Sequence, residues 1–258
     1  VVYRIGTDVI NDGRRQIVSK RVIPDPNNQN HGNEFAGSYS EEAISIRELT
    51  SDLTVSGKFK LTQDLSLRAM VGHNFRERTT NDQFSKINDL VIPGLYNLGN
   101  TSGPPEADNT YQKRRLFGVY TDINLAFKDY LFLGLTGRND WSSTLPVSNR
   151  SFFYPSANLS FVFSEAFQMP KWISYGKVRA SAARVGNDAN PYLLQSNFVP
   201  GVVADGYNNS QLTFPFNGIP GFTVGATIGN PNLTPEFTTS YEGGVEASFL
   251  NNRLGIDL

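Results

Sequence analysis

The sequence predicts an all-β protein, specifically an antiparallel transmembrane β-barrel segment with long extracellular loops and short periplasmic turns. Three observations predict this fold. Apolar side chains alternate with polar ones, connections alternate between short and long, and charged residues keep to one face of each expected strand.

Alternation with a period of two residues is clearest in the segment 65–72. Leu65, Leu67, Ala69 and Val71 share one face there, and Met70 is the one apolar residue on the other. Such a pattern indicates a strand with one apolar and one polar face. It recurs in the segments 53–61, 117–127, 131–138, 153–163, 178–182 and 241–249, and both chain ends resemble strand interiors. We therefore expect about nine strands, the two terminal ones truncated.

The connections between these strands fall into two length classes that follow one another regularly. Short ones are expected near residues 62–64, 128–129, 165–173 and 251–252, and longer ones near 11–42, 81–110, 142–151 and 187–236. Outer-membrane barrels have short turns on one side and longer loops on the other. A soluble carbohydrate-binding β-sandwich, the competing fold, has no reason to sort its loops in this way.

Charged residues indicate which face meets lipid. Facing hydrocarbon near the midplane, each Lys or Arg would cost about 2–4 kcal/mol, so we expect the charged face to line a wet lumen. The charged positions are Lys58, Arg68, Asp122, Arg138, Lys177 and Arg179. Aromatic residues near strand ends predict two interfacial girdles: Phe152, Phe153, Tyr154 and Trp141 on the long-loop side, and Tyr130, Phe163, Trp172 and Tyr175 on the short-turn side.

Composition argues against several classes of function. The net charge is −1, without the basic excess of nucleic-acid binders. There is no cysteine, which excludes cysteine nucleophiles, disulfides and Cys-type zinc sites. No group of residues offers a nucleophile, a base and an orienting partner together, so we expect neither an enzyme nor a cofactor or metal site.

Several long motifs follow one another over nearly the whole chain. Residues 138–146 read RNDWSSTLP, 149–156 NRSFFYPS, 172–181 WISYGKVRAS and 185–188 VGND. Upstream, residues 91–98 read VIPGLYNL, and downstream, residues 230–236 read NPNLTPE. In this order, the motifs resemble the SusC/RagA family of TonB-linked outer-membrane proteins, which are TonB-dependent receptor β-barrels.

The resemblance implies a bacterial outer-membrane barrel of about 22 strands, plugged by an N-terminal domain. It implies TonB-dependent import of oligosaccharides or peptides with a SusD-like surface lipoprotein, energised by the TonB–ExbB–ExbD complex acting on the plug. We expect residues 1–258 to be a partial barrel domain, without plug or remaining strands, which would not transport alone. The alternative function is a non-transporting outer-membrane barrel that acts as a glycan-binding adhesin.

Ligand contact is expected where aromatic faces and hydrogen-bonding side chains meet, since these groups hold sugars. Arg138, Asp140 and Trp141 offer this chemistry at the expected junction of lumen and loop. A motif shared across family members with different cargo is, however, expected to serve the scaffold first. The long loops contribute Tyr96, Tyr192, Phe198, Tyr207 and Asn208 as further candidates, each of which could instead pack its own loop.

Overall fold

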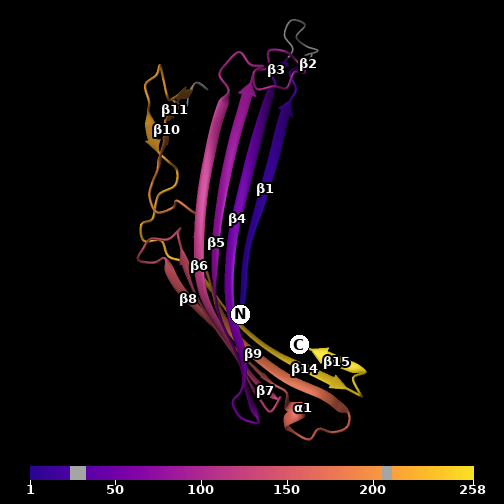
Figure 1. Ribbon diagram of the computed structural model, residues 1–258. Helices are drawn as coiled ribbons and strands as arrows, with labels where there is room; N and C mark the ends of the chain where they lie inside the picture. Colours follow the sequence, from indigo (N-terminus) through magenta and orange to yellow (C-terminus); the bar gives the residue numbers. More distant parts are fainter. Residues whose placement is uncertain (24–32, 205–210) are drawn as a thin grey trace. The chain divides into compact units, whose positions relative to one another are not determined.

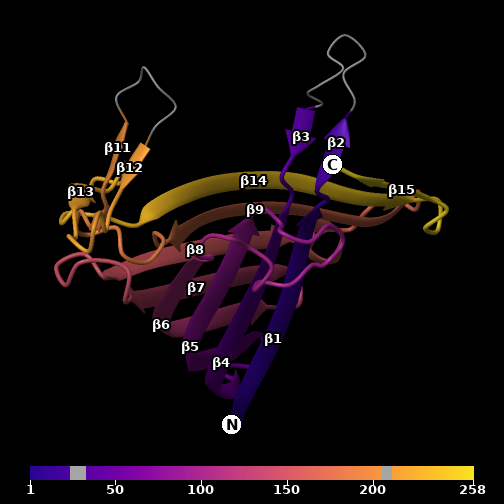
Figure 2. The same ribbon diagram turned by 90° about the horizontal axis from the view of Figure 1, so that it is seen from above.

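A computed structural model describes residues 1–23, 33–204 and 211–258. Within these ranges the protein is built almost entirely of antiparallel strands, with a single one-turn helix, α1 (Phe163–Ala166). One sheet contains nine strands in the order β1-β4-β5-β6-β7-β8-β9-β14-β15, which can be followed in Figures 1 and 2. The expectation of an all-β sheet of about nine strands is confirmed.

The strands of this sheet follow chain order, so each pairs with its neighbours along the sequence. Their bounds are β1 (Val2–Val18), β4 (Ser38–Lys60), β5 (Leu65–Asn88), β6 (Glu106–Phe127), β7 (Leu131–Ser142), β8 (Ser151–Phe161), β9 (Ile173–Asn187), β14 (Glu236–Phe249) and β15 (Leu254–Asp257). No helix in the described ranges is long and apolar enough to cross a membrane.

Three small two-stranded sheets lie in the longer connections. They pair β2 (Arg21–Ile23) with β3 (Asn33–Phe35), β10 (Phe198–Pro200) with β13 (Phe222–Val224), and β11 (Val202–Ala204) with β12 (Gln211–Thr213). The segment expected as one long loop at 187–236 therefore holds two short two-stranded sheets, with the β11–β12 pair lying in sequence between β10 and β13.

The predicted short turns lie where the sequence placed them. Lys128 and Asp129 both adopt positive φ, at 48° and 57°, and join β6 to β7. Leu250, Asn251 and Asn252 also have positive φ and join β14 to β15. Backbone of this handedness matches the twist of paired strands, and Asn and Asp tolerate it better than most residues.

Two predicted loops are shorter than expected, because their flanking strands continue. β1 runs to Val18 and β4 begins at Ser38, whereas the whole of 11–42 was expected as loop. β5 continues to Asn88 and β6 begins at Glu106, inside the expected loop 81–110. Polar residues dominate these extensions, and their few apolar residues, such as Tyr39 and Ile87, are too widely spaced to give a period-two signal. A cross-strand ion pair, Arg14–Glu42 at 3.2 Å, links the extended ends of β1 and β4. Two more pairs, Arg76–Glu48 at 2.7 Å and Lys113–Glu77 at 3.1 Å, lie further along β4, β5 and β6, outside the extensions.

The chain divides into two compact units, each described by itself. Unit 1 contains Val1–Arg4, Ser51–Phe75 and Arg115–Leu258, and unit 2 contains Ile5–Thr50 and Arg76–Arg114. The core of unit 2 is small: Tyr39, Ile87 and Leu90 are buried, and Tyr96 and Leu98 pack against them. The loop beside this core is held by the side-chain amide of Asn100, which donates to the carbonyls of Ile92 and Leu95.

Among the residues that the structure describes, one face of unit 1 exposes many large apolar side chains. Large side chains at alternate positions of its strands are 38% to 56% exposed: Val55, Phe59, Val71, Phe117, Val119, Leu135, Phe153, Leu159, Val178 and Val245. Soluble monomers rarely expose a contiguous apolar surface over so many strands. A barrel wall in contact with lipid requires such a face.

Candidate functional site

The opposite, polar face of unit 1 is held together by side chains that bond from strand to strand. Between β4 and β5, the Asn74 amide donates to Asp52 at 2.6 Å. The hydroxyl of Thr54 lies 2.9 Å from that of Tyr120, which comes from β6 on the far side of β5. These bonds bind three neighbouring strands together through polar groups, as a water-facing wall needs.

The centre of this face is an ion pair between Arg138 and Asp140 on β7. The Arg138 Nε atom donates to Asp140 Oδ1 at 2.8 Å, and the Tyr154 hydroxyl donates to Asp140 Oδ2 at 2.5 Å. The Arg138 guanidinium also lies 5.8 Å from the centre of the Tyr120 ring. Asp140 is only 3% exposed, so its charge is satisfied by the protein rather than by solvent.

Glycines on this face make room for the polar side chains of adjacent strands. A Cβ built on Gly72 would lie 2.6 Å from the Tyr120 ring, and one on Gly118 would collide with Asp140 and lie 2.5 Å from Arg138. A Cβ built on Gly134 would likewise collide with the side chain of Asn158. The polar groups therefore lie flat across the sheet instead of projecting from it.

Gly118→Ala tests this arrangement. The added methyl group would push Asp140 away from Arg138, so we expect a loss of about 1–3 kcal/mol in unfolding free energy. The measurement is a urea titration of the protein folded into lipid vesicles. Gly243→Ala is the matched control, because its Cβ would meet only the Arg179 carbonyl oxygen at 4.0 Å. Equal stability of the two variants would contradict the close packing.

Trp141 lies apart from Arg138 and Asp140, although the sequence grouped the three residues. It pairs with Phe117 across β6 and β7 on the apolar face, with ring centres 5.6 Å apart, and Phe117 in turn lies 5.7 Å from His73. Of the residues predicted for the girdle at the long-loop ends, only Trp141 belongs to this row of rings, and Tyr154 lies on the polar face instead. Phe152, also predicted for the girdle, is instead only 5% exposed and stacks on Tyr154.

Two of the long motifs meet through buried hydroxyl groups that sequence reasoning missed. Ser142 donates to the Asp188 carboxylate, and Thr144 donates to the same oxygen at 3.1 Å. Ser142 and Thr144 are 2% and 3% exposed. The motif at 138–146 is thus tied to the motif at 185–188. This contact indicates a scaffold role for at least part of both motifs.

The loop candidates differ in their surroundings. Tyr96 is half-buried against Tyr39, and its hydroxyl lies 3.1 Å from that of Ser19, so it packs its own loop. Tyr192 is 54% exposed and Phe198 is 72% exposed. Tyr207 and Asn208 lie outside the described residues.

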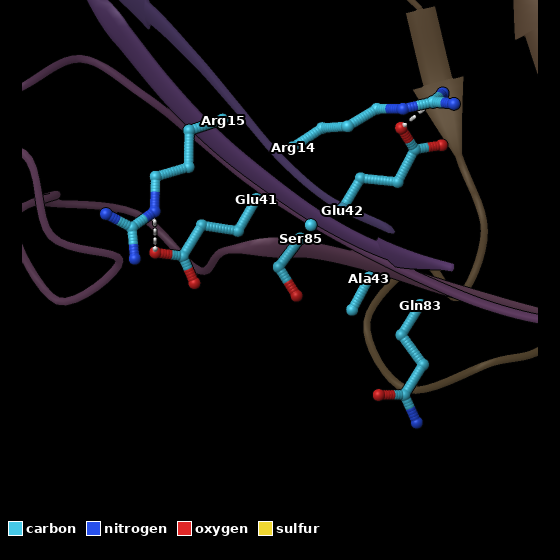
Figure 3. Close-up of a pocket in the computed structure, with 8 residues that line it drawn as sticks. Arg14, Arg15, Glu41, Glu42, Ala43, Gln83 and Ser85 are labelled. Carbon is cyan, nitrogen blue, oxygen red and sulfur yellow. Dashed lines mark hydrogen bonds and ion pairs between the residues drawn. The ribbon is translucent and has the colours of Figure 1, made fainter. Parts of the chain in front are cut away.

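A pocket in unit 2 is lined by charged residues, but the charges compensate one another. Figure 3 shows Arg15 facing Glu41 and Arg14 facing Glu42, with Nε–Oε1 and Nη1–Oε2 distances of 3.7 Å and 3.2 Å. The Tyr39 hydroxyl also donates to Glu41, and this bond raises the pKa of Tyr39 above its ordinary value. Among the described residues, no group of three potential metal ligands occurs.

Comparison with known proteins agrees with this geometry. A family model described as "TonB dependent receptor-like, beta-barrel" matches residues 10–258. The chain belongs to this family. A curated relative, TonB-dependent receptor P26 of Formosa agariphila, is 29% identical over 233 residues, which cover 86% of this chain and 22% of the relative.

Solved structures share the fold of this TonB-dependent receptor barrel. The structure of the RagAB peptide transporter matches with a TM-score of 0.78 and 20% identity, covering 99% of this chain and 27% of that one. The RagAB peptide importer matches in its closed-closed state (TM-score 0.77, 21% identity, coverages 99% and 27%). Its open-open state also matches (TM-score 0.73, 22% identity, coverages 99% and 26%). The chain spans about a quarter of the length of these proteins.

Proposed function

We propose that this chain forms part of the lumenal wall of an outer-membrane importer that takes up oligosaccharides or peptides with energy from TonB. One observation carries the proposal. The sheet of unit 1 has a polar face locked by hydrogen bonds and an opposite face of exposed apolar side chains. A wall between lipid and a water-filled lumen needs both faces.

Membership of the TonB-dependent receptor family supports TonB as the source of energy. The likeness to the RagAB peptide importer supports a cargo that is too large to pass through a porin. Cargo of either kind would meet hydroxyl, amide and aromatic groups on the polar face, such as Tyr120 and Asn158, which suit sugars and peptides alike. The proposal includes a plug domain that the TonB–ExbB–ExbD complex pulls and a SusD-like surface lipoprotein that delivers cargo.

An uptake experiment in the native host tests this function. Fluorescent oligosaccharides and peptides would be given to wild-type cells, to cells lacking the gene, and to cells lacking TonB. We expect periplasmic accumulation of one cargo class in wild-type cells, with loss in both mutants and after addition of an uncoupler.

The outcome that contradicts import is also specific. Cargo that binds the surface equally with and without TonB, and never accumulates in the periplasm, would indicate a glycan-binding adhesin. Co-purification of a surface lipoprotein with the intact protein would test the proposed partner separately.

A further inference from the structure

The cations on the polar face of unit 1 divide into two groups. In the first group, three cations on β7 and β9 each have a carboxylate partner: Arg138–Asp140 at 2.8 Å, Lys177–Glu246 at 3.5 Å and Arg179–Asp257 at 2.9 Å. Near the short turn between β4 and β5, three exposed cations make no ion pair within the described chain: Lys58, Lys60 and Arg68.

Strand register places two of these cations directly opposite each other. The Leu61 amide donates to the Leu65 carbonyl at the turn, and the Asn74 amide reaches Asp52 further along the same strands. An unbroken register between these two points sets Lys58 across from Arg68. Like charges in directly opposite positions destabilise a sheet. The arrangement is thus costly unless a negative group lies between the two cations.

The same cations line a hollow of about 550 Å³ on this part of the sheet. The amide side chains of Asn124 and Asn158 and the hydroxyl of Ser66 also line it, and no acidic residue does so among those described. Of the acids outside the lining, Asp64 in the short turn pairs with Lys128 at 3.6 Å, and Asp122 on β6 accepts a hydrogen bond from Asn124. The hollow therefore offers two kinds of donor to an anion, charged and neutral, with no competing carboxylate in its lining.

We propose that Lys58, Lys60 and Arg68 form a binding site for carboxylate groups on the lumenal wall, near the short-turn end. Its place on the lumenal wall rests on the proposed function. Carboxylates could come from an acidic cargo or from another part of the intact protein, and the chemistry of the site is the same for both. With cargo, the site would favour acidic peptides or acidic sugars over neutral ones.

Calorimetric titration of the intact protein in detergent tests the site without any transport. The probe is tetraglutamate, with tetraglutamine as its neutral analogue. We expect tetraglutamate to bind, tetraglutamine not to bind, and the double variant Lys58→Gln, Arg68→Gln to weaken tetraglutamate binding about tenfold or more. Lys177→Gln is the matched control, since that cation lies on the same face but has its own partner in Glu246, and it should change the affinity by less than about twofold.

If the wild-type protein does not bind tetraglutamate, the unfolding temperature of the variants decides the proposal. An unfolding temperature of the double variant below that of Lys177→Gln would show that a carboxylate of the intact protein already fills the site. The proposal is overturned if there is no probe binding and the double variant unfolds at the same or a higher temperature, as expected when repulsion is merely relieved. Because neither measurement needs energised uptake, failure of import would leave their results intact.

Discussion

Leu135→Arg is expected to lower the stability of the membrane-inserted protein by about 2–4 kcal/mol, because it places a guanidinium in the hydrocarbon. Leu135 lies in the middle of β7 and is 39% exposed on the apolar face. It is flanked across the sheet by Ile123 on β6 and Ala157 on β8. The measurement is the urea midpoint of unfolding from lipid vesicles.

Thr136→Arg is the control for this prediction, since it adds the same side chain one residue further along, on the opposite face. Thr136 shares a hydrogen bond of 2.5 Å with Ser156 on the polar face, so we expect a loss of only about 0.5–1.5 kcal/mol. A larger loss at Thr136 than at Leu135 would mean that the two faces have been assigned the wrong way round.

Asp140→Ala is expected to cost about 2–3 kcal/mol of unfolding free energy. The change removes the acceptor for both Arg138 and Tyr154, and it leaves a guanidinium that is 28% exposed without its carboxylate. Partial exposure of Arg138 keeps the expected loss below that of a fully buried pair. The same urea titration measures it.

Glu246→Ala breaks the more exposed pair with Lys177 and serves as the matched control. Its partners are 3.5 Å apart and their side chains are 26% and 39% exposed, so we expect a loss below about 1 kcal/mol. If Asp140→Ala leaves stability unchanged but abolishes cargo binding, the Arg138–Asp140 pair contacts ligand and is not a part of the scaffold.

The sequence predicted strands well wherever one face is apolar and the other polar. The segments 65–72 and 131–138 show this alternation, and both lie within strands, β5 and β7. The positive-φ turn at Lys128 and Asp129 was also predictable, because turn residues separate two alternating runs. The long-loop ends of β4 and β5 were missed, because their few apolar residues, such as Tyr39 and Ile87, are too widely spaced to form a period-two pattern.

The candidate site was predictable only in part, for a physical reason. Face parity within β7 could have separated Trp141 from Arg138 and Asp140, because odd and even residues of a strand point in opposite directions. The same parity on β6 would have indicated Tyr120 as a polar-face residue. The contact of Ser142 and Thr144 with Asp188 depends on how β7 and β9 lie across β8, and no local pattern encodes this.

The central claim is that one face of unit 1 meets lipid and the other meets water. Nitroxide labels on single cysteines, placed in turn at positions 131–138 of the intact protein in lipid vesicles, test it directly. We predict that labels at 131, 133 and 135 collide mainly with lipid-soluble oxygen, and that labels at 134, 136 and 138 collide mainly with a water-soluble nickel chelate. Equal access of the nickel chelate to both sets would contradict a lipid-facing barrel wall and indicate a sheet in water.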